Sequence, residues 1–342
     1  MPGDQAAEAE INTSPYTIAS TPGSSISIRG LTKHYPGADS PAVDAVDMEI
    51  QPGEFVVLLG PSGCGKTTLR NMITRIYEPT AGTVLIDGVN ILDRKPAELR
   101  RQIGYVIQQT GLFPHMTIAG NIAVVPKLLG WTKDHINSRV RELLTLVGLD
   151  PDDYASRYPT QLSGGEQQRV GLARALAVQP PTMLMDEPFG ALDAITRKRL
   201  QEELLRIHKA ISQTVVFVTH DIDEAVRLAD RIAVMRAGKV EQFGTPLEIV
   251  QRPANQFVAD LVGTDDVLRR FSLMTAGAAM DDLPQTMEDV PRIAQSVYLR
   301  EALGIMAESG APYLVVTDDL TTDPVGTLSF GSIQRAAAPI AE

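Results

Sequence analysis

A glycine-rich segment between an apolar run and a helical pattern constrains the fold of this chain more than any other feature. Residues 55–59 form a continuous apolar run of strand length, residues 60–67 fit the pattern GxxxxGK followed by Ser or Thr, and residues 68–73 begin a helical pattern. Strands and helices continue to alternate downstream of this unit. The sequence therefore predicts an α/β fold with a parallel sheet core that is covered by helices.

The same loop predicts a nucleoside triphosphate ligand. Glycines permit a sharp turn that brings backbone N–H groups close to phosphate oxygens, and the following helix directs its positive end at the same anion. We expect Lys66 to reach the β- and γ-phosphates, and the Thr67 hydroxyl to ligate the Mg²⁺ that bridges them. A glycine-rich turn without a ligand is the alternative. The nucleotide contacts expected in this segment are Gly60, Pro61, Ser62, Gly63, Cys64, Gly65, Lys66, Thr67 and Thr68.

Polar side chains end two further predicted strands. Asp186 and Glu187 follow the apolar run 182–185, and His220 follows the β-branched run 214–219. The C-terminal ends of parallel strands are where α/β sheets place their ligands. We predict that Asp186 is an outer partner of Mg²⁺ and that Glu187 is the general base for an attacking water. The alternatives are a solvated acidic pair before a proline turn and a structural histidine.

Residues 162–169, LSGGEQQR, connect these motifs to a known family. The segment resembles the LSGGQ signature of ATP-binding-cassette (ABC) ATPases, with Glu166 where that family most often has Gln. The resemblance extends from about Ile28 to Leu261, and the motifs occur in the family's order. The matching positions are Tyr35 for the adenine-stacking aromatic, Gln108 for the Q-loop glutamine, Ala191, Leu192 and Asp193 for the D-loop, and His220 for the switch histidine.

The resemblance implies a fold, a cofactor and an assembly. The expected fold is the P-loop NTPase cassette, with a mixed sheet core, an antiparallel β edge subdomain and a helical subdomain. Two heads of a homodimer are expected to enclose two ATP molecules with Mg²⁺. Gln108 joins Glu187 and His220 as an expected catalytic residue, and it joins Thr67 and Asp186 in the expected Mg²⁺ site. The signature contacts expected on the nucleotide are Ser163, Gly164, Gly165 and Glu166, together with Asp193 of the D-loop.

Segments around these motifs resemble one subgroup, the ATPase subunits of glycine betaine, carnitine and choline importers. They are residues 71–73, 103–109, 111–117, 121–131 and 185–193. This resemblance implies a membrane permease, a substrate-binding protein that acts through it, and a peripheral location at the cytoplasmic face of the membrane. The segment from Gln108 to Asn121 is the expected permease-docking surface. An importer of methionine, phosphonate or polyamine is one alternative, and a cassette ATPase acting on DNA or ribosomes is another.

Composition agrees with this interpretation. The formal charge of −11 and the pI near 5.0 argue against a nucleic-acid partner, which requires a basic face. No apolar stretch approaches the roughly 18–20 residues that span a bilayer. Residues 1–25 contain no Lys or Arg, whereas a secretory signal begins with a positively charged region, so a secretory signal is not expected.

Cys64 is the only cysteine and is interpreted as a small side chain in the loop, with a redox role as the alternative. The basic cluster 197–199 is interpreted as a solvated helix face.

The chain of 342 residues is divided into four predicted parts. These are a disordered extension (1–25), the cassette (26–263), a linker (264–291) and a small α+β tail (292–342). Within the cassette, residues 26–32 and 45–50 are expected to form antiparallel edge strands. Residues 97–147 are expected to be mostly helical, with Gly148 as a helix stop.

The tail resembles a single cystathionine-β-synthase (CBS) motif, with the order strand, helix, strand, strand. Ser329 and Ser332 stand where nucleotide-binding members have Thr and Asp, so an adenosine ligand is not expected. The apolar stripe Leu299, Ala302, Leu303 and Met306 is expected to lack an internal partner and to pair two tails across a dimer. A packing domain without a sensory role is the alternative.

Overall fold

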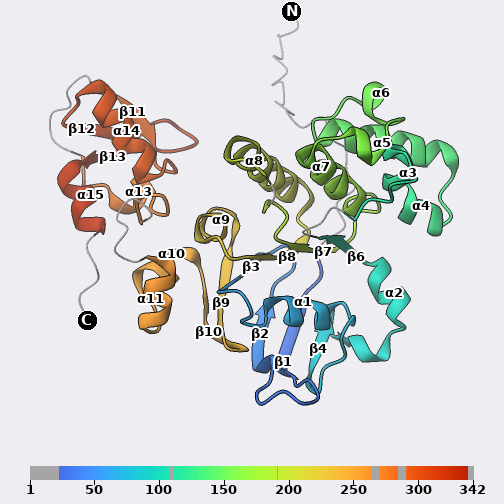
Figure 1. Cartoon of the computed structure of the whole chain (residues 1–342). Coiled ribbons are helices and arrows are strands. Elements are labelled where there is room, and N and C mark those ends of the chain that lie inside the picture. Colours follow the sequence, from blue (N-terminus) through green and yellow to red (C-terminus); the bar gives the residue numbers. More distant parts are fainter. Residues whose placement is uncertain (1–22, 108–110, 191, 264–269, 284–289, 338–342) are drawn as a thin grey trace, which may run out of the picture.

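The computed structural model describes residues 23–107, 111–190, 192–263, 270–283 and 290–337. Most of the predicted disordered extension, residues 1–22, lies outside these ranges, as do Gln108 and Ala191. Three sheets and the helices around them make up the described part (Figure 1). No helix in the described ranges combines the length and the low charge that a membrane-spanning helix needs.

A six-stranded sheet in the order β10-β9-β3-β8-β7-β6 forms the core. Strands β6, β7, β8, β3 and β9 run parallel to one another, and β10 is antiparallel to β9. The C-terminal ends of the parallel strands therefore meet at one edge of the sheet. The strands are β3 (Phe55–Leu59), β6 (Ile103–Val106), β7 (Thr182–Asp186), β8 (Thr214–Thr219), β9 (Arg231–Arg236) and β10 (Lys239–Gly244).

A four-stranded antiparallel sheet, in the order β2-β1-β4-β5, packs against one face of the core sheet. Its strands are β1 (Ile26–Lys33), β2 (Val43–Ile50), β4 (Ala81–Ile86) and β5 (Val89–Asn90). The two edge strands predicted from the sequence are thus confirmed. Register shifts along β1 at residues 28–33 bend it where it approaches residue 35.

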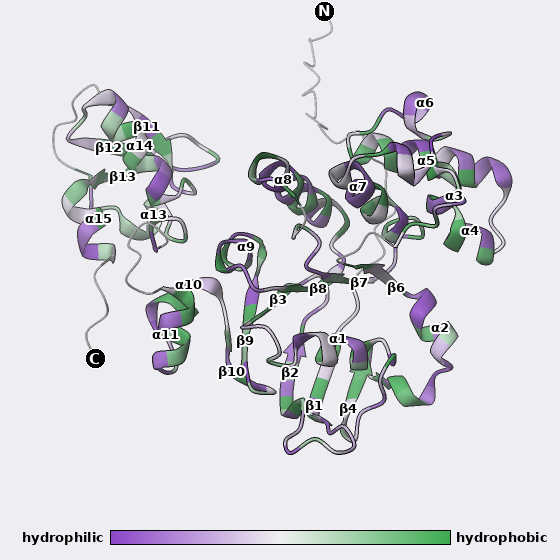
Figure 2. Ribbon diagram, in the orientation of Figure 1, coloured by the Kyte–Doolittle hydropathy of each residue, from purple (hydrophilic) through white to green (hydrophobic). Residues whose placement is uncertain are grey.

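Helices cover both faces of the core sheet, and Figure 1 places α3 to α6 beyond its β6 edge. In Figure 2, α7 and α8 are striped green and purple, as expected for helices that bury one side and expose the other. The helices of the cassette are α1 (Lys66–Ile73), α2 (Pro96–Arg101), α3 (Ile118–Ile122), α4 (Val124–Leu128), α5 (Lys133–Leu146), α6 (Pro151–Tyr154), α7 (Gly164–Ala175), α8 (Ala194–Ile211), α9 (Ile222–Leu228), α10 (Pro246–Gln251) and α11 (Gln256–Val262).

Strand β3 divides the core into two hydrophobic clusters. Phe55, Val57 and Leu59 face the helices on one side, and Val56 and Leu58 face α1 and the antiparallel sheet on the other. All five side chains are buried, which explains the continuous apolar run in the sequence. This double burial fixes the strand that leads into the glycine-rich loop.

One prediction within the cassette needs correction. Residues 103–106 lie inside the segment expected to be mostly helical, but they form the edge strand β6, which pairs in parallel with β7. Ile103 and Val106 are buried in the core, so tertiary packing rather than local pattern decides their conformation. The predicted helix stop is confirmed, since Gly148 follows α5 with a φ of 69°.

The tail has a three-stranded sheet in the order β11-β12-β13, with a hydrophobic core of its own. Part of the predicted linker belongs to this core, because Phe271 and Met274 pack in it with the tail's helices. Leu247 of α10 also packs against it, which joins the tail to the end of the cassette. The elements are α13 (Ala276–Ala279), β11 (Arg292–Ala294), α14 (Leu299–Ser309), β12 (Tyr313–Thr317), β13 (Pro324–Ser329) and α15 (Phe330–Ala337).

The apolar stripe on α14 was expected to lack an internal partner, and this expectation was wrong. Leu299 and Ala302 are fully buried, and Met306 is nearly so. Leu303 is partly buried against the same cluster. The stripe is the inner face of the tail's own core, because residues 271–280 fold back over the sheet and supply the partner that the pattern did not show.

Candidate nucleotide site

The loop between β3 and α1 has the backbone that its glycines permit. Gly63 and Gly65 have φ angles of 78° and 109°, which other residues rarely adopt. A Cβ on Gly65 would lie 2.4 Å from the carbonyl oxygen of Ala42, whereas a Cβ on Gly63 would meet open space. Gly65 is therefore needed for close packing, and Gly63 for the turn at the exposed face of the loop.

Lys66 lies within the loop instead of extending into solvent. Its side chain is buried, and Nζ donates hydrogen bonds to the carbonyl oxygens of Gly60 (2.6 Å) and Pro61 (3.0 Å). It also lies 3.6 Å from the sulfur of Cys64, which is buried. The ammonium group is thus held at the concave side of residues 60–65, where a phosphate chain would be cradled.

Asp186 ends β7 and is paired with Arg70 of α1, a contact that the sequence analysis did not anticipate. The Arg70 guanidinium is buried, forms an ion pair with Asp186 and donates to the side-chain oxygen of Asn71 at 2.9 Å. It also lies over the ring of Tyr105, 5.1 Å from the centroid. Burial raises the pKa of Tyr105, and the nearby Arg70 charge acts in the opposite direction. Arg70 therefore positions the carboxylate beside the helix that begins with Lys66.

The donors at this sheet edge fit a magnesium ion that is completed by phosphate oxygens. Mg²⁺ prefers oxygen ligands, keeps several waters and is usually bound by one or two protein groups together with substrate phosphates. The exposed Thr67 lies in the first turn of α1, and the Arg70 ion pair brings the Asp186 carboxylate to the same helix. The described residues contain no group of three or more metal-ligating side chains. A site that depends on the phosphates is consistent with both observations.

Glu187 and His220 are in contact, as a base and its neighbour would need to be. His220 Nδ1 lies 3.1 Å from Glu187 Oε1. The Glu187 backbone N–H donates to the carbonyl oxygen of Val218 on β8, and its φ of 42° is left-handed. A non-glycine residue in this region carries backbone strain, and such strain clusters at functional sites. The fold therefore turns the chain sharply after Asp186 and points the Glu187 carboxylate at His220.

Tyr35 lies in the loop after β1 with other aromatic and basic groups. Its ring packs edge to face against Tyr77, with centroids 5.9 Å apart, and Lys33 Nζ lies 5.4 Å from its centroid. The ring is only partly buried, so part of its surface is accessible to a base.

The signature segment begins helix α7 and is closed by its own side chains. Ser163 is the N-cap, and its backbone N–H and hydroxyl both donate to Glu166 Oε2 at 2.7 Å. Tyr154 donates its hydroxyl to the other oxygen, Glu166 Oε1, at 2.5 Å. These bonds, led by that from Tyr154, lower the pKa of Glu166 to about 2. Glu166, which replaces the family's usual Gln, is therefore a carboxylate with partners in its own subunit. Gly164 and Gly165 follow in the first turn.

Asp193 acts as the N-cap of α8, and this gives it a local structural role. Its Oδ1 accepts hydrogen bonds from the backbone N–H groups of Thr196 (3.0 Å) and Ile195 (3.1 Å). These bonds, chiefly the one from Thr196, hold the pKa of Asp193 below its usual value. The side chain that resembles the D-loop aspartate thus fixes the start of this helix.

The basic cluster 197–199 is not the uniformly solvated face that the sequence suggested. Arg197 donates to the carbonyl oxygen of Leu192 (3.3 Å) and to Asp221 Oδ2 (3.4 Å), and its Nε lies 3.9 Å from the buried Glu224. Burial raises the pKa of Glu224. Arg197 therefore links the residues beside Asp193 to the helix that follows His220. Only Lys198 and Arg199 are exposed, and Arg199 borders a cavity.

The expected residues from β3, β7 and β8 thus meet at one sheet edge, whereas Ser163 to Glu166 lie on a separate helical layer of the same subunit. Gln108 lies outside the described residues, so its predicted roles remain predictions. The contacts of Arg70, Tyr154 and Arg197 were not predicted from the sequence. The Ser-x-x-Glu spacing of residues 163–166 carried a signal for the capping box between Ser163 and Glu166, but not for the contact of Glu166 with Tyr154.

Comparisons with known proteins agree with this geometry. The ABC transporter family model matches residues 43–190. The glycine betaine/carnitine/choline transport ATP-binding protein OpuCA of Bacillus subtilis is 48% identical over 294 residues, which cover 86% of this chain and 75% of that protein. The spermidine/putrescine import ATP-binding protein PotA of Acidothermus cellulolyticus is 47% identical over 255 residues, covering 74% and 65%. A dimeric post-hydrolysis structure of the ATP-binding cassette MJ0796, bound to ADP and Pi, superposes with a TM-score of 0.59 at 35% identity and covers 65% of this chain and 98% of that one.

The phosphate loop and the polar residues at the sheet edge define a P-loop nucleoside triphosphatase. The extent and identity of the matches are more specific. The chain belongs to the ABC transporter family, among its ATPase subunits.

Proposed function

We propose that this chain is the ATP-hydrolysing subunit of a binding-protein-dependent importer for osmoprotectants such as glycine betaine, choline or carnitine. The observation that best supports ATP hydrolysis by this chain is the contact between Glu187 and His220 at the sheet edge. The proposed cargo rests on the relative OpuCA, whose match covers more of the chain than the match to PotA does. We place the subunit at the cytoplasmic face of the membrane, beneath a permease that receives cargo from a substrate-binding protein.

The proposed reaction is hydrolysis of the β–γ phosphoanhydride of ATP. Glu187 accepts a proton from a water whose oxygen attacks the γ-phosphorus, and the bond to the bridging oxygen breaks with its electron pair on ADP. Lys66 meets the negative charge on the phosphates, and His220 holds the Glu187 carboxylate and lies beside the attacked group. Mg²⁺, when held by Thr67, Gln108 and Asp186 with the phosphates, would supply further positive charge there.

We propose that each nucleotide also contacts a second subunit. Ser163, Gly164 and Gly165 belong to a different layer from the phosphate loop, so a contact in trans is one way for the signature to reach the γ-phosphate. The dimeric MJ0796 cassette supports such an arrangement. Tyr35 would stack on the adenine, and Glu166 and Asp193 would order the contacting helix ends.

The permease would dock at the segment before α3, which is rigid and carries an exposed aromatic ring. The buried Asn121 accepts a hydrogen bond from the Phe113 backbone N–H (2.7 Å) and donates to the carbonyl oxygens of Phe113, Met116 and Thr117. These bonds fix the loop, while the Phe113 side chain stays 40% exposed. A preformed loop with an exposed ring suits a hydrophobic protein contact.

We propose that the tail is a CBS-like module that does not bind adenosine. Ser329 and Ser332 satisfy each other, because the Ser329 backbone N–H donates to Ser332 Oγ (2.9 Å) and the Ser332 N–H to Ser329 Oγ (3.1 Å). The pair therefore serves as a cap for α15. The α14 stripe lies inside the tail's own core and is therefore not available to pair two tails.

The catalytic assignment is tested with Glu187→Gln in single-turnover assays. The variant should bind MgATP normally and hydrolyse it at least about 10²-fold more slowly, because it keeps the shape and loses the base. Lys66→Ala is the matched control, and it should weaken MgATP binding itself. Near wild-type turnover by Glu187→Gln would contradict the assignment, as would equal MgATP affinity in the two variants.

An importer of polyamines remains the second candidate, since the identity to PotA is almost the same as that to OpuCA. Purifying the tagged chain with its membrane partners and identifying the co-purifying substrate-binding protein separates the two candidates. A polyamine-binding partner would overturn the osmoprotectant proposal and leave the ATPase assignment intact.

A further inference from the structure

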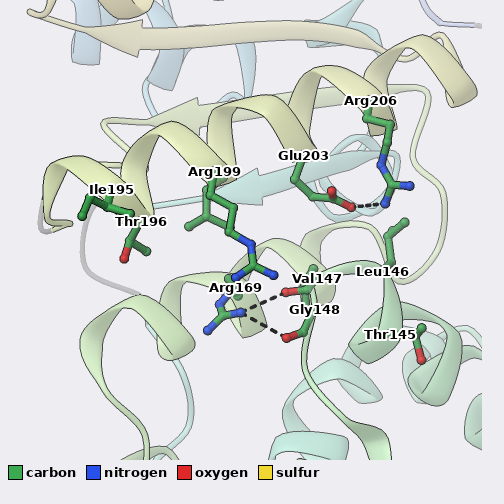
Figure 3. Close-up of a pocket in the computed structure, with 11 residues that line it drawn as sticks. Thr145, Leu146, Val147, Gly148, Arg169, Ile195, Thr196, Arg199, Glu203 and Arg206 are labelled. Carbon is green, nitrogen blue, oxygen red and sulfur yellow. Dashed lines mark hydrogen bonds and ion pairs between the residues drawn. The ribbon is translucent and has the colours of Figure 1, made fainter.

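A cavity of about 320 Å³ lies between the end of α5, helix α7 and helix α8 (Figure 3). None of its lining residues is among the expected nucleotide contacts. Its volume falls within the range of small-molecule sites. We call it the arginine pocket, and its lining residues are Thr145, Leu146, Val147, Gly148, Arg169, Ile195, Thr196, Arg199, Leu200, Glu203 and Arg206.

The arginine pocket is positively charged in a protein of formal charge −11. Three arginines line it against a single carboxylate, Glu203, which pairs with Arg206 at 2.5 Å. Arg169 and Arg199 are left without a carboxylate among the lining residues. In Figure 3 these two side chains converge beside Val147 and Gly148, while the Glu203–Arg206 pair lies further along α8.

The two guanidinium groups approach the same point. A Cβ on Gly148 would lie 3.6 Å from Arg169 Nη1 and 3.8 Å from Arg199 Nη2. Arg169 Nη1 donates to the carbonyl oxygens of Gly148 (3.1 Å) and Val147 (3.4 Å), but its Nε is buried without a hydrogen-bond partner. Among the described residues, Arg199 makes no hydrogen bond or ion pair. Two positive charges therefore lie at one place, and the donors of Arg199 are free to bind an anion there.

We propose that the arginine pocket binds a small phosphate-bearing molecule. Planar guanidinium groups donate paired hydrogen bonds to tetrahedral oxyanions, and an anion between Arg169 and Arg199 would remove their mutual repulsion. The apolar side chains of Leu146 and Leu200 also line the pocket and can contact a non-phosphate part of the ligand.

Such a ligand would connect the two helices that carry the signature and the D-loop residues. Arg169 lies on α7, which begins after Ser163, and Arg199 lies on α8, which begins after Asp193. A molecule held by both arginines would favour one relative position of these helices. Binding at the pocket would then modulate the ATPase cycle by its differential affinity for the two positions.

The test is pyrophosphate binding to the full chain, measured by isothermal titration calorimetry at fixed ionic strength with the nucleotide site saturated by MgADP. Wild type should bind pyrophosphate at the pocket, and Arg199→Glu should lower the affinity at least about tenfold, because it removes a charged donor and adds a repelling carboxylate. Lys198→Glu, the same charge change at the exposed neighbouring position, should change it by less than about threefold.

Arg199→Gln serves as a second variant, which removes the charge without adding a carboxylate and should weaken binding in the same direction. An unchanged MgADP affinity and melting temperature show that each variant is folded. No pyrophosphate binding by wild type, or an equal loss in Arg199→Glu and Lys198→Glu, would overturn the proposal. Tighter binding of citrate than of pyrophosphate would overturn the assignment to phosphate. Because the readout is binding rather than turnover, these outcomes are independent of the proposed transport function.

Discussion

The N-termini of α1 and α7 are both expected to meet phosphate, yet they are built differently. Helix α1 follows Gly65, and among the described residues no side chain caps it and no acidic residue occupies its first turn. Helix α7 follows Ser163, which forms a capping box with Glu166, so its first turn already contains a carboxylate. The N-terminus of α1 is therefore open to an anion from outside the subunit, whereas the N-terminus of α7 already contacts the Glu166 carboxylate.

This difference shows how one chain can contribute unequal halves to the proposed composite site. The N–H groups and dipole of α1, together with Lys66, favour phosphate without rearrangement. At α7, the Ser163 hydroxyl donates to Glu166, so it must give up that bond before it can donate to a phosphate. We infer that the signature half is the more easily regulated of the two, because its contact with nucleotide competes with an internal one.

Of the substitutions that test this comparison of α1 and α7, replacement of glycine by alanine at the two N-termini is expected to have the largest effect. Gly65→Ala places a Cβ against the Ala42 carbonyl oxygen and forces a left-handed φ on alanine, so the free energy of unfolding should fall by about 1–3 kcal/mol and MgATP binding should weaken. Gly164→Ala meets open space and should change stability by less than about 0.5 kcal/mol. Urea unfolding and nucleotide titration measure both; equal losses would remove the contrast between the helices.

A smaller effect is expected from Glu166→Gln, and it depends on pH. The pKa of Glu166 is lowered from 4.5 to about 2, so its contribution to stability is complete above about pH 5 and is lost as the pH falls toward 2. Because the carboxylate is partly solvated, we expect wild type to exceed the variant by only about 1 kcal/mol at pH 7.

Urea unfolding of wild type and Glu166→Gln from pH 3 to pH 7 measures this dependence. The gap between the two proteins should narrow as the pH is lowered. A gap that is constant with pH would mean that the Glu166 charge does not stabilise the start of α7.

The smallest effect is expected from Tyr154→Phe, which removes only the hydroxyl that donates to Glu166. Stability should fall by about 0.5–1 kcal/mol, and the pKa of Glu166 should rise toward its usual value. An NMR titration of the Glu166 carboxyl reports the pKa. Tyr298→Phe, at an exposed tyrosine of the tail, is the control and should leave that pKa unchanged. An unchanged pKa in Tyr154→Phe would show that Ser163 alone holds the carboxylate.

The sequence predicted the parts of the site that depend on short continuous patterns. The apolar run of β3, the glycine-rich loop and the carboxylates at the end of β7 were all identified, because each is formed by residues that are consecutive in the chain. The family was confirmed by the comparisons. The Arg70–Asp186 ion pair was not predicted, because it joins a helix and a strand whose relative position depends on the sheet order.

The tail shows the limit of periodicity as evidence. The spacing of Leu299, Ala302 and Met306 correctly predicted an amphipathic helix. It did not show which segment covers the apolar face, and the expectation that this face lacks an internal partner was wrong because Phe271, Met274 and their neighbours cover it. Similarly, the run 197–199 showed three positive charges, but only the fold shows that Arg197 turns toward Asp221 and Arg199 toward a cavity.

The left-handed backbone of Glu187 has a consequence for the evolution and engineering of this protein. Glycine would adopt its φ of 42° without strain and would relieve about 1–3 kcal/mol. A search for thermostable variants should therefore favour glycine at this position, although the same change deletes the proposed base. Selection for heat resistance alone would drive the chain toward an inactive protein, and a screen for stable variants needs a turnover assay beside it.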